Sequence, residues 1–182
     1  MLAVAAANEP VDMNTVRVTV PAGAASLDLK FDFLLTSNTG GYSSASSATE
    51  NLLILSWNQV LFYPASAQSD RVNFDASLVL PAGWKQATAL PVRGTDGGAI
   101  TFGTASLTTL VDSPVLCGRW FRSIDISPKE GPPYAIDMAC DGPEGLAMGD
   151  SVIAQAHLHH GPGFIGTESP TGTRGRGVHS HL

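Results

Sequence analysis

The sequence predicts a mostly β fold: an antiparallel sandwich-like or saddle-like domain with a short C-terminal helix and a disordered tail. Short apolar runs alternate with polar residues along the first two thirds of the chain. The 19 glycines and 12 prolines suit many short strands joined by turns better than helices. With 182 residues, 43% hydrophobic and 14% charged, the chain is expected to be globular and to bury a core.

The most apolar run is NLLILSWNQVLFYP, residues 51–64. A small polar segment, residues 36–49, precedes it and is expected to form a flexible surface loop. The run itself predicts a strand buried on both faces or at the centre of a sheet. A buried helix of the same length remains the alternative, because periodicity alone does not separate the two. The β-patterned surroundings favour the strand.

Two segments near the N-terminus alternate between apolar and polar residues. Residues 15–20 place valines on one face, and residues 26–33 place leucines and phenylalanines on one face with Asp28, Lys30 and Asp32 on the other. The second segment has the strongest strand pattern in the chain and predicts an antiparallel strand with one solvated face. We expect the two segments to form a hairpin or to lie side by side.

Further elements follow in order. Residues 71–80 predict a strand whose phase slips at Asp75-Ala76, as at a bulge. An Asp-Gly-Gly turn between residues 86–92 and 99–102 predicts a hairpin, because glycine tolerates positive φ. Residues 106–111 predict a short helical turn.

Residues 114–126 and 134–139 predict a second hairpin around a loop at 127–133. If this loop is the turn, Cys140 lies closer to Trp120 than to Cys117. We therefore expect two buried free thiols and no disulfide.

The chain changes character near Asp141. Pro143 and Glu144 are typical of the first turn of a helix. Residues 1–143 are predicted to be one β domain, residues 144–160 a possible helix, and residues 161–182 a disordered tail rich in glycine and proline. The net charge of −6 argues against nucleic acid or an anionic membrane as partner.

All five histidines lie late in the sequence, and His157 and His160 would share one face of a helix. They are the only candidate metal ligands. Since no cysteine lies near them and no His-Glu-x-x-His motif is present, we expect adventitious nickel or zinc binding rather than a physiological site.

Other constellations also favour ordinary structural roles. Carboxylates that could pair for acid–base work lie mostly at outward positions of the predicted strands, where a solvated face is expected: Asp28, Asp32, Asp112, Asp125 and Asp137. Three tryptophans could line a sugar-binding platform, but core packing is their more common role: Trp57, Trp84 and Trp120. No catalytic or cofactor-binding residue is predicted.

Four segments in order carry a family resemblance: 11–13 with 18–35, 51–64, 80–85 with 89–91, and 107–114 followed by 118–122. Together they resemble the N-terminal β domain of the glycyl aminopeptidase family, the zinc metallopeptidase family M-sixty-one. The resemblance covers residues 11–143. It implies an N-terminal all-β domain followed by a thermolysin-like catalytic domain that carries His-Glu-x-x-His and zinc. No residue here matches those catalytic or zinc motifs.

The resemblance implies a non-catalytic accessory domain that packs on the catalytic domain in cis and shapes substrate access, inactive alone and without its own cofactor. We expect strands before Val11 and the catalytic domain after Asp141 to be missing, as in a truncated or frame-shifted reading frame. Open sheet edges would then allow self-association. A free-standing β-sandwich that binds carbohydrate or protein is the alternative. Location is left open between the bacterial cytoplasm and the exported or periplasmic space.

Overall fold

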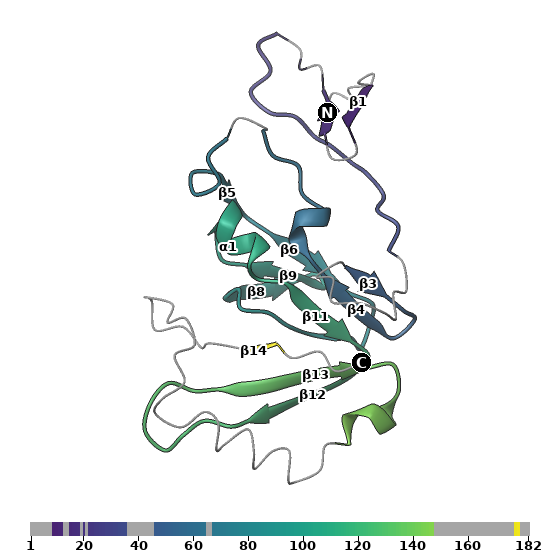
Figure 1. Ribbon diagram of the computed structural model, residues 1–182, viewed down its shortest axis with the longest axis vertical. Helices are drawn as coiled ribbons and strands as arrows, with labels where there is room; N and C mark the ends of the chain where they lie inside the picture. Colours follow the sequence, from purple (N-terminus) through teal and green to yellow (C-terminus); the bar gives the residue numbers. More distant parts are fainter. Residues whose placement is uncertain are drawn as a thin grey trace.

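The computed structural model describes residues 9–12, 15–18, 20, 22–35, 46–64, 67–147 and 177–178. These residues form mostly antiparallel β-structure with a single short α-helix among them, which confirms the predicted fold class (Figure 1). None of the helices in these ranges is both long and apolar enough to cross a membrane.

The principal sheet has four antiparallel strands in the order β3, β4, β11, β7. Their bounds are Ser47–Ala48 for β3, Leu52–Leu55 for β4, Val115–Gly118 for β11 and Lys85–Ala87 for β7. The predicted strand in residues 51–64 is therefore present at an inner position, but it ends at Leu55. Residues Trp57–Gln59 turn into a 3-10 helix, η1. The strand that is buried at every position is β11.

A second sheet of three strands follows the order β6, β9, β8. Its strands are β6 (Ser77–Val79), β8 (Val92–Asp96) and β9 (Ala99–Phe102). The turn between β8 and β9 has φ of 56° at Gly97 and 87° at Gly98. Both values favour glycine and match the strand twist, so the predicted turn and its second strand are confirmed. The first strand of the hairpin is Val92–Asp96 and not residues 86–92, which begin in β7 of the principal sheet.

The predicted slip at Asp75-Ala76 separates two strands that join different sheets. β5 (Asn73–Phe74) pairs with β10 (Ala105–Ser106), whereas β6 pairs with β9. Directly after β10, α1 (Leu107–Val111) confirms the predicted helical turn. Ser106 caps this helix, because its Oγ accepts a hydrogen bond of 3.1 Å from the backbone N–H of Thr109.

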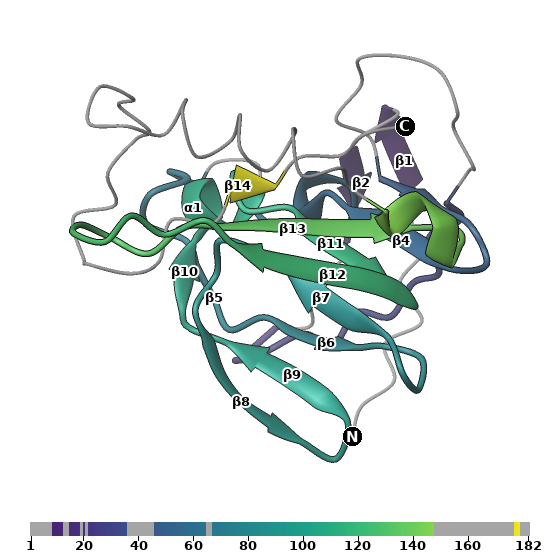
Figure 2. The same cartoon turned by 90° about the horizontal axis from the view of Figure 1, so that it is seen from below.

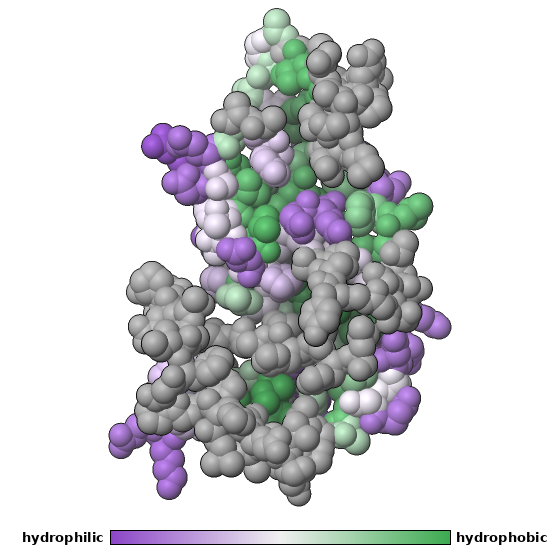
Figure 3. Space-filling model, viewed as in Figure 1, coloured by the Kyte–Doolittle hydropathy of each residue, from purple (hydrophilic) through white to green (hydrophobic). Residues whose placement is uncertain are grey.

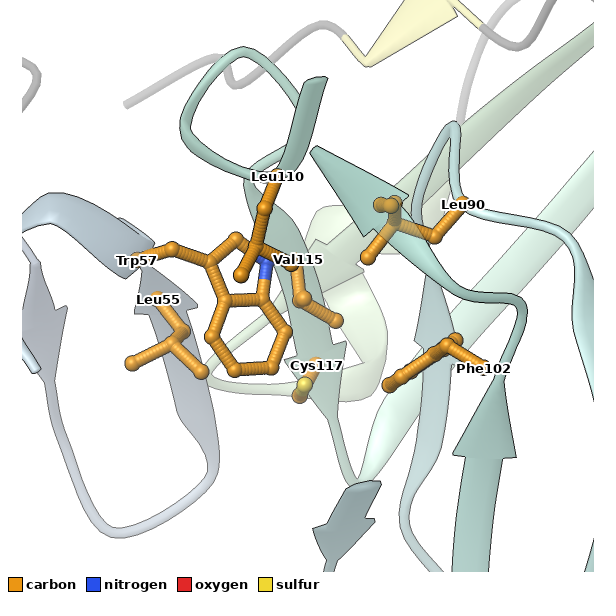
Figure 4. Close-up of a cluster of buried hydrophobic side chains, with 8 residues drawn as sticks. Leu55, Trp57, Leu90, Phe102, Leu110, Val115 and Cys117 are labelled. Atoms are coloured by element: carbon orange, nitrogen blue, oxygen red, sulfur yellow. The ribbon is translucent and has the colours of Figure 1, made fainter. Parts of the chain in front are cut away.

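The core lies between the two sheets and is closed by η1 and α1 (Figure 4). Alternation along β4 and β11 sends Leu55, Val115 and Cys117 to one face of the principal sheet. There they meet Phe102 from β9 and Leu110 from α1. The remaining buried members of the core are Trp57, Leu90 and Ala105.

The hairpin of β12 (Trp120–Asp125) and β13 (Ala135–Cys140) lies against the lower end of this body (Figures 1 and 2). Its register pairs Trp120 with Cys140, as predicted. Both Cys117 and Cys140 are free thiols as expected, but only Cys117 is buried, because Cys140 is half-buried at the end of β13. A further strand, β14 (Gly177–Val178), pairs in parallel with β13. The hairpin approaches the second face of the principal sheet, where Gly118 of β11 meets Ala139 of β13.

The expected N-terminal pairing is wrong. β2 (Thr15–Arg17) pairs with β1 (Glu9–Asp12) and not with residues 26–33. Residues 26–35 contain no strand, turn or bend and run as an extended trace beside the body (Figure 1). Their alternating pattern is that of a strand, but a strand requires a partner, and no described residue pairs with this segment.

At the C-terminal end, Pro143–Leu146 forms a 3-10 helix, η2, with Pro143 and Glu144 in its first turn. Helix initiation at this point was predicted, but η2 ends at Leu146, because Ala147 is extended with ψ of 92°. The rest of the predicted helix, residues 148–160, lies outside the described residues, as does the predicted disordered tail except for β14.

Candidate functional site

The predicted metal-ligand candidates, His157 and His160, lie outside the described residues, so the structure does not test them. In the part of the chain that the structure describes, no group of three or more His, Cys, Asp or Glu side chains is placed to hold a metal ion.

The carboxylates considered for acid–base chemistry lie on separate elements. Asp28 and Asp32 lie on the extended segment, Asp112 follows α1 and Asp125 ends β12, and all four are exposed as expected. Asp137 is the exception, with 1% exposure. Alternation along β13 places it on the same face as Ala139, which contacts the body of the domain. The expectation of a solvated side chain is therefore wrong for Asp137.

The tryptophans do not form a platform. Trp57 is 6% exposed, packs edge-on against Phe102 with ring centroids 6.2 Å apart, and donates a 2.9 Å hydrogen bond from Nε1 to the carbonyl oxygen of Ser113. Trp84 is half-buried and packs against the same core. Trp120 is half-buried on β12, with the Arg119 guanidinium 5.8 Å from its ring centroid. Core packing is thus confirmed for Trp57 and Trp84, and the carbohydrate-binding alternative loses its main support.

The cysteines are poor nucleophiles. Burial raises the pKa of the Cys117 thiol to about 12. The pKa of Cys140 is also raised, first by burial and then by the negative charges of Asp141 and Glu144. Because thiolate is the reactive form, both side chains remain thiols near neutral pH.

The feature most typical of an interaction surface is the extended segment. We use the name apolar strip for its alternate residues Leu27, Leu29, Phe31, Phe33 and Leu35. The middle three are 45%, 43% and 45% exposed. Phe31 packs edge-on against Phe62, with ring centroids 4.7 Å apart. In Figure 3, hydrophobic side chains reach the surface at the right-hand edge of the molecule.

Contiguous apolar exposure of this kind usually marks a contact surface. The alternating pattern of residues 26–33 predicts a strand in a sheet. The pattern of an exposed strip was therefore present in the sequence, but the pattern does not show that no described residue pairs with the segment.

A second feature is the junction at which the chain leaves the sheets. The Oγ1 of Thr49 donates a hydrogen bond to the Asp141 carboxylate, and the Nδ2 of Asn51 donates one of 3.1 Å to the Asp141 carbonyl oxygen. At the end of η2, the carbonyl oxygen of Leu146 accepts a hydrogen bond of 3.1 Å from Arg122 Nη1. These contacts tie η2 to the β3–β4 turn and to β12.

Residues 4–119 match the family described as the peptidase M61 N-terminal domain. The chain belongs to this family. The resemblance to the glycyl aminopeptidase family is thereby confirmed, and the chain is an accessory domain of the M61 type. The matched region includes the apolar strip and the principal sheet and ends just before β12. No curated protein matches the sequence.

Proposed function

We propose that this M61 N-terminal domain packs on the catalytic domain of an M61 peptidase in cis and helps to shape the access of substrate to its cleft. The family match is the observation that carries the proposal. Bond cleavage would belong to the catalytic domain, since the sequence contains no His-Glu-x-x-His from which a zinc-activated water could be generated.

The C-terminal junction supports a fixed arrangement of the two domains. Since Asp141 is hydrogen-bonded to the β3–β4 turn and Leu146 to β12, η2 has a defined position beside the β12–β13 hairpin. A domain that follows this point would be held near the hairpin rather than on a loose tether. Glu144 is exposed on η2 and would lie near such a contact.

The proposal is tested by mixing the full chain with a separately produced M61 catalytic domain that carries His-Glu-x-x-His. Binding is measured by calorimetry, and release of N-terminal glycine from peptides is measured with and without the chain. We expect a complex and a lower KM in its presence. The chain alone should release no glycine or alanine in the presence of zinc.

A matched pair of charge reversals locates the contact. Glu144→Lys changes η2, and Glu130→Lys makes the same change in the distant loop of the β12–β13 hairpin, where Glu130 is also exposed. We expect Glu144→Lys to weaken binding to the catalytic domain and Glu130→Lys to leave it unchanged. Absence of any complex, or zinc-dependent cleavage by the chain alone, would overturn the proposed function.

A further inference from the structure

The extended segment, residues 26–35, has the alternating composition of a strand, but no other described strand lies paired with it. Among the described residues, no backbone hydrogen bond involves 26–35, which run without turn or bend. The backbone N–H and C=O groups of an extended, unpaired segment are available to another strand. The packing of Phe31 on Phe62 holds the segment beside the domain at one point.

We propose that a second copy of this chain covers the strip, through antiparallel pairing of residues 27–35 of the two copies around a twofold axis at Phe31. This inference goes beyond the proposed function and does not depend on it. Because directly opposed residues lie on the same face, such a pair would place the two apolar strips on one face of a two-stranded ribbon.

The charges on the other face select the register. With the axis at Phe31, each Lys30 lies opposite Asp32 of the second copy, and the twofold repeats this favourable pair. With the axis at Lys30, lysine would oppose lysine and Asp28 would oppose Asp32, which are repulsive pairs. With the axis at Asp32, Asp32 would oppose Asp32, and with the axis at Phe33 it would oppose Leu34.

An axis at Leu29 also gives opposite charges, because Asp28 then lies opposite Lys30. That register, however, places Phe33 opposite Ala25 and Leu35 opposite Gly23. The axis at Phe31 instead pairs every member of the apolar strip with another member. On the other face it forms the two Lys30–Asp32 pairs and leaves Asp28 opposite Leu34. It therefore combines favourable charge pairs with complete pairing of the apolar strip, which the neighbouring registers do not.

A ribbon of two strands is marginal in water without further packing. Phe62, which is 47% exposed and already touches Phe31, gives each copy an apolar surface on which the ribbon can rest. The expected dimer is accordingly weak and concentration-dependent.

The test is sedimentation equilibrium of the full chain over a wide concentration range, with charge variants. Lys30→Asp turns both Lys30–Asp32 pairs into like-charge pairs, and we expect it to raise the dimer dissociation constant about tenfold or more. The double variant Lys30→Asp/Asp32→Lys restores opposite charges in this register and should restore the dimer. Lys129→Asp, the same charge change on an exposed loop, should leave the dissociation constant unchanged.

The register with the axis at Leu29 predicts that a different double variant restores the dimer. If the axis were at Leu29, Asp28→Lys/Lys30→Asp would restore the dimer and Lys30→Asp/Asp32→Lys would not. Amide hydrogen exchange gives an independent readout, since the alternate amides of 27–35 that bond across the ribbon should become protected as the concentration rises.

A chain that remains monomeric, a dimer insensitive to Lys30→Asp, or rescue by the Asp28/Lys30 exchange would each overturn the proposal. Protection of 27–35 that does not depend on concentration would show that another part of the same chain covers the strip. That result would also overturn it. None of these outcomes bears on binding to a catalytic domain, which is measured separately.

Discussion

Gly118 of β11 and Ala139 of β13 approach so closely that a Cβ added at Gly118 would lie 2.9 Å from the Cβ of Ala139. The same Cβ would lie 3.3 Å from the carbonyl oxygen of Asn51. Small residues on both strands thus allow the β12–β13 hairpin to reach the principal sheet. Glycine is required at this position by the close approach of the two layers.

Gly118→Val should lower the free energy of unfolding by about 1–3 kcal/mol, because the side chain would force the layers apart. Urea denaturation followed by circular dichroism measures the change. Gly94→Val is the matched control, because an added Cβ at Gly94 has nothing within 4 Å. Equal stability of the two variants would contradict the close packing.

Trp57→Phe should destabilise the domain by about 1–3 kcal/mol. The substitution removes the 2.9 Å hydrogen bond to the Ser113 carbonyl oxygen and leaves a void in the core. The carbonyl oxygen still accepts a hydrogen bond of 3.2 Å from Thr88 Oγ1, which limits the loss. Trp120→Phe, at a half-buried position on β12, should have the smaller effect in the same denaturation experiment.

Ser106→Ala should lower the free energy of unfolding by about 1 kcal/mol, because the N–H of Thr109 loses its capping acceptor. Ser106→Thr keeps a hydroxyl at the N-cap and should retain most of the stability. Thermal unfolding of both variants against the parent chain checks this, and a loss as large for threonine as for alanine would argue against a capping role.

Cys117 should make stability fall in alkaline solution. Its pKa is raised from 9.0 to about 12 in the folded domain, so above pH 9 the unfolded chain loses a proton that the folded chain still holds. Unfolding then becomes easier as pH rises, and the contribution is fully present below pH 9 and lost as pH approaches about 12.

The measurement is the free energy of unfolding against pH for the parent chain and for Cys117→Ala. The variant will be less stable at neutral pH, but its curve should fall less steeply above pH 9, because it lacks the Cys117 thiol. Parallel curves would mean that Cys117 ionises equally in the folded and unfolded states.

The elements predicted correctly depend on local sequence. The Gly97-Gly98 turn, the helical turn after Ser106 and the break at Asp75-Ala76 follow from residues within a few positions of one another. The register of Trp120 against Cys140 followed from the position of the hairpin loop. Family membership also followed from ordered local segments.

The errors concern contacts between distant residues. Alternation in residues 26–33 indicates a strand but does not say which strand pairs with it, and the segment has no partner among the described residues. Alternation also gives two faces to β13 without saying which one meets the body, so the burial of Asp137 was missed. The sequence shows the alternating pattern of the apolar strip, but it does not show that these side chains are exposed.

The sequence by itself determined the β class, the turns and the family, because backbone preferences and short apolar periods act over a few residues. The tertiary structure alone decided that β11 is the fully buried strand, that Gly118 lies against Ala139 and that the apolar strip remains at the surface. These features depend on which surfaces meet across long sequence separations. Local preferences constrain such contacts only weakly, because many strands of similar composition compete for the same partners.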